Sequence, residues 1–431
     1  MGGLLLVLGC CALARPPARA AIINRTLRGE PTTQLTIALG GFAPAYVQEV
    51  DLGTLGAAVL TADLRFTTVF DVMDPTQLPF APPTVQLSTV QTTFPGLSAL
   101  KVQYLALGTV APRGPEVLLD ARLYDVATGM QVFGRRYVGD PQYFRGLVHR
   151  FADDILFHLT GDHGVAETRI AYVRAISRTE KELYVMDYDG ARPVPITANH
   201  SINVSPRWSP DGTALAYTSY EAGNPDIYLW HLDSGRRTLL SAVHGLNASP
   251  GWAPDGQTLA LARTAGEGTA LCLVPATGGP AQALTHGSAI NVSPSFSPTG
   301  QELAFTSDRG GTPQLYLMDR DGTDVRRLTF QGRYNTSPRW SPRGDRIAFT
   351  CRTAGKQICL ISPEGTDLQQ LTIAGSNEDP AWAPDGRHLV FTSNRTGHRA
   401  LFVMQANGSE QQLLAADPDA EYLPDWSPIE R

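Results

Sequence analysis

From about residue 168 onward the chain repeats a short motif, Ser-Pro-x-Trp-Ser-Pro-Asp-Gly, at a nearly constant interval. Short apolar runs such as Leu215–Thr218 and Ile227–Trp230 follow the motif and are separated by turns rich in Gly, Asp and Asn. A period in the forties with four strand signals per unit is typical of β-propeller blades. We expect the motif's aromatic residue to pack between neighbouring sheets and not to form a ligand cage. It recurs with spacings of 44, 44, 44, 42 and 44 residues, at Trp208, Trp252, Phe296, Trp340, Trp382 and Trp426.

The two ends of the repeat array complement each other. Arg169–Val173 matches the second strand of the unit and Leu183–Asp187 the third, but no first-strand motif precedes them. At the other end, Leu423–Pro428 is that first strand alone. We therefore predict that the C-terminal strand joins the N-terminal three, which closes a six-bladed propeller and removes exposed sheet edges.

The region before the repeats has no such period and is predicted to be a small α/β domain. One helix is expected over Asp51–Leu64, with Asp51 as its N-cap. A second is expected near Gln142–Leu159, where apolar residues keep the i, i+3, i+4 rhythm. The expected strands are Thr67–Met73, Val102–Val110, Glu116–Asp125 and Gln131–Tyr137. This gives a multidomain protein with an N-terminal α/β domain over residues 21–165 and an all-β propeller over residues 166–431.

The first twenty residues are typical of a secretory signal peptide. The apolar run Leu4–Ala14 is followed by Ala18-Arg19-Ala20, which predicts cleavage near Ala20. A lipoprotein signal is the alternative, because Val7–Cys10 loosely resembles a lipobox. No later stretch of about 18 apolar residues occurs. We expect an exported protein with residues 1–20 removed.

Charge and cysteine usage narrow the function further. The net charge is −6, from 35 basic and 41 acidic residues, so the clustered basic excess of a nucleic-acid-binding protein is missing. Cys351 and Cys359 are eight residues apart across a short turn. They are either two small buried side chains, which we favour, or a cross-strand disulfide. No Cys/His spacing resembles a zinc site, and no metal or cofactor is expected.

The alternative to a binding protein is an enzyme. Residues 21–165 are too few for an α/β-hydrolase domain, and no G-x-S-x-G elbow occurs. The nine His residues show no H-E-x-x-H or paired spacing, and Asp319–Asp324 is interpreted as a hairpin turn and not as a calcium loop. We expect no catalytic residues. A propeller that binds a saccharide or other small ligand in its channel stays an alternative, and a metal-dependent propeller enzyme is a less favoured one.

A polar residue stands three positions before the first Pro of each repeat. We expect these residues to form a ring on one face, at the loops that lead into the innermost strands. Such a ring can hydrogen-bond a docked loop, or each Asn can bond its own backbone as in an Asx-turn; both roles can coexist. The six positions are Asn203, Asn247, Asn291, Asn335, Asn377 and Glu421.

The segment His149–Val173 (HRFADDILFHLTGDHGVAETRIAYV), together with the repeats, resembles the TolB family of periplasmic propeller proteins of the Tol–Pal system. The resemblance covers nearly the whole chain after the leader. It implies a non-enzymatic, monomeric periplasmic adaptor that binds the lipoprotein Pal through its propeller and the protein TolA through its extreme N-terminus. Through Pal it would associate peripherally with the outer membrane, supporting its invagination at cell division and its integrity.

The resemblance also places candidate contacts. Pal would meet the loops before the Pro residues, so Leu246, Ser249 and Val292 join the six ring positions as candidates. Glu421 breaks the ring's symmetry and is expected to meet a cation or donor of the partner. The TolA-binding strand would lie in Ala21–Thr26 and is an ordinary frayed terminus in the alternative interpretation. Its candidate residues are Ile22, Ile23, Asn24 and Arg25.

Overall fold

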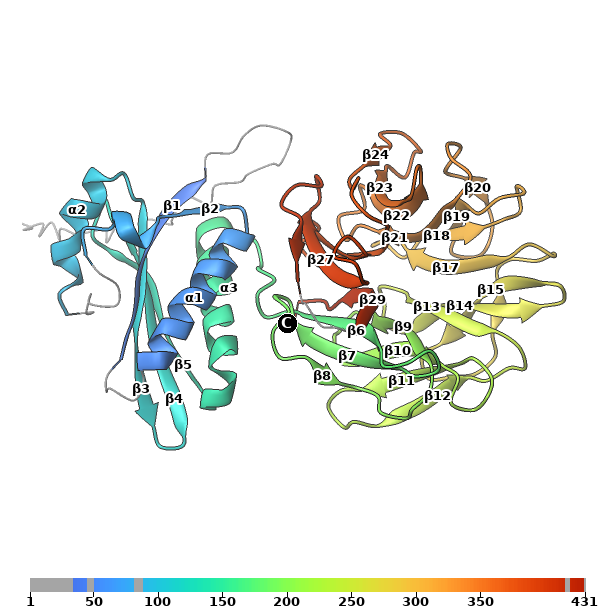
Figure 1. Cartoon of the computed structure of the whole chain (residues 1–431), viewed down its shortest axis with the longest axis horizontal. Helices are drawn as coiled ribbons and strands as arrows, with labels where there is room; N and C mark the ends of the chain where they lie inside the picture. Colours follow the sequence, from blue (N-terminus) through green and yellow to red (C-terminus); the bar gives the residue numbers. More distant parts are fainter. Residues whose placement is uncertain (1–33, 45–49, 81–87, 415–418, 430–431) are drawn as a thin grey trace, which may run out of the picture.

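The computed structural model describes residues 34–44, 50–80, 88–414 and 419–429. An N-terminal α/β domain lies beside a β-propeller, and its helices α1 and α3 are on the side that faces the propeller (Figure 1). The predicted leader, residues 1–20, and the predicted TolA-binding residues Ile22, Ile23, Asn24 and Arg25 lie outside the described residues. Among the helices of the described ranges, none is both long and apolar enough to cross a membrane.

The N-terminal domain is built on a five-stranded sheet in the order β2-β1-β3-β4-β5. Strand β1 is parallel to both of its neighbours, whereas β3, β4 and β5 are antiparallel. The strands are β1 (Leu35–Pro44), β2 (Phe70–Val72), β3 (Tyr104–Arg113), β4 (Glu116–Asp125) and β5 (Gln131–Gly139). The helices are α1 (Val50–Phe66), α2 (Phe94–Ala99) and α3 (Phe144–Thr160), with 3₁₀ turns at Pro75–Gln77, Val90–Thr93 and Pro141–Tyr143.

Helix α3 forms because its apolar residues recur on one face. Phe144, Val148, Phe151 and Ile155 are buried in one cluster together with residues of α1 and the sheet. The helix ends at Gly161, which adopts the left-handed conformation with φ of 79°. A smaller cluster on the opposite face of the sheet contains Phe94 and Leu97 of α2 together with Leu105 and Leu107 of β3. The sheet is therefore covered on both faces.

Several predicted elements of this domain differ from the structure. Helix α1 begins at Val50, so Asp51 lies in the first turn and its prediction as N-cap is wrong. Strand β2 is shorter than the predicted Thr67–Met73. Neither β1 nor α2 was predicted, because the Gly pair that interrupts β1 produces a bulge between Leu39 and Gly41, and α2 is a short helix of six residues.

The propeller consists of six four-stranded sheets. In each blade the innermost strand carries the Ser-Pro motif or its variant, and in the five blades built from consecutive strands the Asp-Gly turn or its equivalent leads to the next strand. The innermost strands are β29 (Ala420–Trp426), β9 (Asn203–Trp208), β13 (Asn247–Trp252), β17 (Asn291–Phe296), β21 (Asn335–Trp340) and β25 (Asn377–Trp382). The second strands are β6 (Arg169–Ala175), β10 (Ala214–Ser219), β14 (Thr258–Ala265), β18 (Glu302–Ser307), β22 (Ile347–Arg352) and β26 (His388–Ser393).

The outer half of each blade holds a third strand and a short outermost one. The third strands are β7 (Lys181–Asp187), β11 (Asp226–His231), β15 (Gly268–Pro275), β19 (Gln314–Asp319), β23 (Lys356–Ile361) and β27 (Ala400–Gln405). The outermost strands are β8 (Val194–Pro195), β12 (Arg237–Ser241), β16 (Gln282–Ala283), β20 (Arg326–Arg327), β24 (Gln369–Gln370) and β28 (Gln412–Leu413).

The predicted circular closure is confirmed. Strand β29 pairs with β6 in the sheet β29-β6-β7-β8, with Tyr422 opposite Val173 and Trp426 opposite Ile170. The aromatic stripe also packs between sheets as predicted. Trp340, for example, lies in one apolar cluster with Leu315 and Leu317 of the preceding blade.

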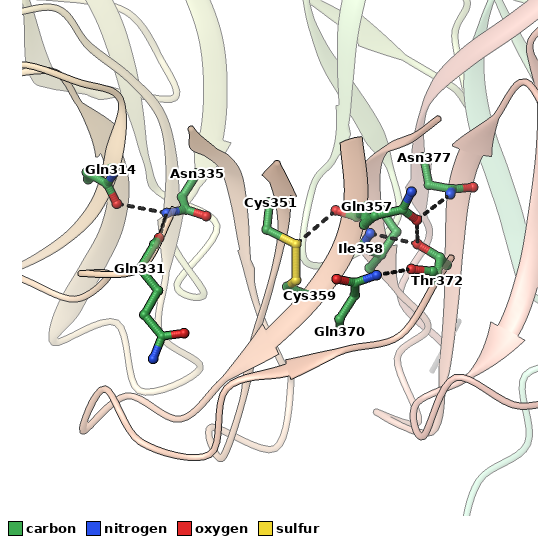
Figure 2. Close-up of a disulfide and its surroundings, with 10 residues drawn as sticks. All are labelled: Gln314, Gln331, Asn335, Cys351, Gln357, Ile358, Cys359, Gln370, Thr372 and Asn377. Atoms are coloured by element: carbon green, nitrogen blue, oxygen red, sulfur yellow. Dashed lines mark hydrogen bonds between the residues drawn. A yellow bond between two sulfur atoms is a disulfide. The ribbon is translucent and has the colours of Figure 1, made fainter. Parts of the chain in front are cut away.

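The two cysteines form a disulfide, so the favoured interpretation as separate buried side chains is wrong (Figure 2). Cys351 of β22 is opposite Gln357 of β23, which leaves Cys359 at a diagonal position with its Cα 5.9 Å from that of Cys351. This separation lies within the ordinary range for disulfides. Whether the two cysteines bond depends on the register of the hairpin formed by β22 and β23, and their spacing along the chain does not give that register.

The N-terminal domain packs against one end of the propeller's strands. Phe66 at the end of α1 stacks on His388 at the start of β26, with ring centroids 4.1 Å apart, and Arg387 pairs with Asp162. His388 lies at the same end of its blade as Trp382, whereas Asn377 lies at the other end. The polar ring predicted from the repeats is therefore at the end of the propeller that faces away from the N-terminal domain.

Candidate partner-binding face

Each innermost strand carries the same irregularity two residues after its ring position. The residue just before the Pro has a positive φ of 53° to 55°, and the pairing with the second strand shifts register there. Non-glycine residues adopt this conformation rarely, and its sixfold repetition identifies a built-in bulge. The residues are Ser205, Ser249, Ser293, Ser337, Asp379 and Leu423.

The five ring amides are buried and bonded within the chain. Asn335 Nδ2 donates to Gln314 Oε1 at 2.8 Å, and Asn377 Nδ2 donates to Gln357 Oε1 at 2.9 Å (Figure 2). Asn203 makes the same kind of bond to Glu182 Oε2, at 2.9 Å. In each case the acceptor lies on the third strand of the preceding blade. The ring therefore joins neighbouring blades.

The amides of Asn247 and Asn291 are likewise bonded within the chain. Asn247 Nδ2 donates to the carbonyls of Pro225 and Val243, and Asn291 Nδ2 donates to that of Thr269 at 2.7 Å. The bonds run backward to the preceding loop and blade, and not to the residue two positions on, as in an Asx-turn. Glu421, the sixth ring position, lies 3.6 Å from Arg174 of its own chain.

The loops around the ring carry exposed apolar side chains among polar ones. Leu246, Ser249 and Val292 are partly exposed on the ring's face, where the predicted Pal contacts were placed. Four further apolar side chains are more exposed, and the sequence analysis did not single out Val243, Phe330 or Ile373. They lie in the loops that lead into innermost strands, one to five residues before a ring Asn: Val243, Ile290, Phe330 and Ile373. We call these four and their loops the loop face.

Phe330 and Ile373 are the most exposed of the four, at 73% and 86%. Beside Phe330 a cavity of about 420 Å³ opens between two blades and is also lined by Leu368 and the disulfide Cys351–Cys359. A sequence pattern could have located this surface. It is an apolar residue between a short outermost strand and the next ring Asn. Exposed apolar side chains beside an apolar cavity are a candidate contact surface for a partner.

The channel holds an ion-pair cluster. Asp425 of β29 lies 2.6 Å from Arg339 and 3.9 Å from Arg207. Burial and the nearby positive charge of Arg339 lower the pKa of Arg207 to about 9. A cavity of about 350 Å³ lies where the innermost strands end, near the motif's Trp and Pro residues. Because Asp425 of β29 attracts arginines of β9 and β21, this cluster is suited to holding three blades together.

Comparison with known proteins decides the family. A family model described as the TolB beta propeller domain matches residues 157–430, and one described as the TolB amino-terminal domain matches residues 26–132. The chain belongs to the TolB family. A crystal structure of TolB from Acinetobacter baumannii has a TM-score of 0.78 and 25% identity, and the match covers 93% of this chain and 98% of that one. The predicted fold is therefore confirmed.

Curated TolB sequences match more locally. The Tol-Pal system protein TolB of Desulfosudis oleivorans is 36% identical over 179 residues, which is 42% of this chain and 41% of that protein. The TolB homolog of Chlorobium chlorochromatii is 36% identical over 225 residues, 52% of this chain and 50% of that protein. The matches thus span half or less of these TolB relatives. A nidogen/laminin complex, at 12% identity and a TM-score of 0.51 over 61% of this chain, shares the fold alone.

Proposed function

We propose that this TolB-family protein is a non-enzymatic adaptor of the Tol–Pal system in the periplasm. It binds Pal through the loop face and TolA through residues 21–26, and it supports outer-membrane invagination at cell division and envelope integrity. Membership of a family whose relatives are named Tol-Pal system protein TolB carries the proposal.

The loop face supports the proposed Pal site. Its exposed apolar side chains, Phe330 and Ile373 above all, lie at the end of the propeller opposite the N-terminal domain. The ring amides beneath hold the loops in one conformation, which lowers the entropy lost when a partner binds. In this proposal Asn203, Asn247, Asn291, Asn335, Asn377 and Glu421 act by positioning the loops, and Leu246, Ser249 and Val292 contact Pal directly.

The disulfide supports the proposed compartment. Disulfides persist in oxidising compartments such as the bacterial periplasm and are rare in the cytosol. Cys351–Cys359 joins two strands of one blade near the loop face. This agrees with export directed by the predicted leader.

Binding of a saccharide or other small ligand in the channel is the second candidate. The 350 Å³ cavity with Arg207, Arg339 and Asp425 is the observation in its favour. Against it, the indole rings that would stack on a sugar are enclosed between blades, with Trp208 and Trp340 only 5% and 8% exposed. The adaptor is therefore favoured.

The experiment is a binding assay with the mature chain immobilised. Purified Pal without its lipid and TolA without its membrane anchor are the two analytes, and a chain lacking residues 21–26 is the variant. We expect the variant to lose TolA and retain Pal. Failure of the full mature chain to bind Pal would overturn the proposal, and saturable binding of periplasmic oligosaccharides instead would favour the channel.

A further inference from the structure

Three potential metal ligands meet where the two domains touch. His149 is on α3, Asp187 is the last residue of β7, and Asp189 is in the turn that follows. One ring nitrogen of His149 and one carboxylate oxygen from each Asp lie within 4.8 Å of one another. The cluster is thus shared between the N-terminal domain and the first blade.

Asp63 fixes the imidazole of His149 through the ring nitrogen Nδ1. Its Nδ1 is 2.8 Å from Asp63 Oδ2, and Asp63 Oδ1 accepts a hydrogen bond from the Tyr188 hydroxyl at 2.6 Å. A carboxylate bonded to one ring nitrogen of a metal-bound His is the usual outer-shell arrangement, because it fixes the tautomer and raises the basicity of the other nitrogen. That other nitrogen, Nε2, has no hydrogen-bond partner although the His149 side chain is only 2% exposed.

An unpaired buried nitrogen is costly, and here it calls for a cation. With Nδ1 carrying its proton toward Asp63, the neutral ring keeps its lone pair on Nε2, and a ring nitrogen of His149 lies within 4.8 Å of a carboxylate oxygen of both Asp187 and Asp189. A proton or a metal ion satisfies the nitrogen and is attracted by both carboxylates.

The net charge of the surrounding side chains allows a cation to bind. Arg192 bonds both oxygens of Asp187, at 2.8 and 3.0 Å, and Arg145 pairs with Asp189. These two guanidinium groups balance two carboxylates, and the charge of Asp63 remains. Each carboxylate oxygen has two lone pairs, so an oxygen bonded to an arginine can still accept a metal ion.

Access and geometry are also suitable. A cavity of about 540 Å³ is lined by His149 and Asp187 together with Glu167, Arg169 and Arg192. It can admit the ion and the water that completes its coordination. Zn²⁺ bonds nitrogen and oxygen at about 2.0–2.2 Å, so the ligand atoms must move closer together, which the partly exposed turn that carries Asp189 permits.

We propose that His149, Asp187 and Asp189 bind one divalent transition-metal ion, Zn²⁺ by ligand chemistry, which links the N-terminal domain to the first blade. An imidazole with two carboxylates suits Zn²⁺, whereas Mg²⁺ and Ca²⁺ take oxygen ligands alone. The proposal is independent of Pal and TolA binding.

The test is calorimetric titration of ZnCl₂ into the untagged, EDTA-stripped mature chain at pH 7.5, with MgCl₂ as the comparison ion. We expect one Zn²⁺ per chain, little heat from Mg²⁺, and a higher thermal midpoint with Zn²⁺. Asp189→Asn removes one ligand from a turn and should weaken binding at least about tenfold. His149→Gln should abolish it, and circular dichroism checks that both variants fold.

The matched control is His200→Ala. His200 is 81% exposed and belongs to the other metal-type cluster of the described residues, with Glu180 and Glu182. It should bind Zn²⁺ as the wild type does. The proposal is overturned if no saturable binding occurs, if Asp189→Asn binds like the wild type, or if binding is lost in His200→Ala instead.

Discussion

The backbone N–H of Trp208 donates a hydrogen bond to Asp425 Oδ2 at 2.8 Å, although the two residues are 217 positions apart. Trp208 ends the innermost strand of the second blade, and Asp425 lies on β29, the strand that completes the first. The other oxygen of Asp425 accepts from Arg339, across the channel, at 2.6 Å. One carboxylate of the last strand therefore joins three blades.

This relationship predicts the effect of removing the last strand. Deletion of residues 422–431 takes away the pairing with β6 and the carboxylate of Asp425, which leaves two guanidinium groups facing each other in the channel. Loss of one partner from a buried ion pair costs about 3–5 kcal/mol. We expect the midpoint temperature of thermal unfolding of the propeller, measured by circular dichroism, to fall sharply. A deletion of residues 430–431 alone is the control, and a normal melt of the longer deletion would refute closure as the source of stability.

The hydrogen bonds of the ring amides predict a loss of stability when one amide is replaced by a carboxylate. In Asn335→Asp the donating nitrogen becomes an oxygen that faces two acceptors, Gln314 Oε1 and the Gln331 carbonyl. A buried polar group left without its partner costs about 1–3 kcal/mol, and more when it is charged. We expect the free energy of unfolding in urea to fall by about 2–3 kcal/mol. Asn407→Asp is the matched control, because the exposed Asn407 uses its oxygen only as an acceptor; equal losses would contradict the role given to the ring.

The loop face predicts a change in binding without a change in folding. Phe330→Ser combined with Ile373→Ser removes the two most exposed apolar side chains of the loop face. We expect the dissociation constant for Pal to rise by about fivefold or more, which corresponds to at least 1 kcal/mol. The thermal midpoint should stay the same. Leu239→Ser, on the outermost strand β12 and 51% exposed, is the control; an equal effect there would place the Pal site elsewhere.

Asp153 predicts a pH dependence of stability. Burial raises its pKa to about 7, although the backbone N–H groups of Ala166 and Glu167 bond its carboxylate. The folded chain then holds a proton that the unfolded chain has lost, so stability falls as pH rises from about 4 to 7, by at most about 1.4 kcal/mol per pH unit. Asp153→Asn should remove this slope. Urea unfolding of both proteins across the range measures it, and parallel profiles would contradict the assignment.

The propeller could be read from the sequence because its signals are local and repeated. The spacing of the Trp residues and the unmatched strands at Arg169–Val173 and Leu423–Pro428 predicted six blades and their closure. The N-terminal domain was predicted less completely. Strand β1 and helix α2 have no repeat to reveal them, and the packing of the sheet decides their limits.

The sequence predicted where the ring residues lie in the propeller but not which groups they bond. Alignment of the repeats placed Asn335 and Asn377 at one end of the propeller, and the structure agrees. That the amides bond the preceding blade follows from how neighbouring blades pack, a distance that spacing along one strand does not contain. The exposed Phe330 and Ile373 were missed for the same reason, because exposure depends on the neighbours of a side chain.

The sequence by itself determined the number of blades, the closure and the family, since a periodic pattern of apolar and turn residues specifies which strands pair. Only the tertiary structure decided that Cys351 bonds Cys359, that the ring is buried, and that His149 of α3 meets Asp187 and Asp189 of the first blade. These three outcomes depend on strand register and on the docking of one domain against another. Both are settled by packing between segments far apart in the chain.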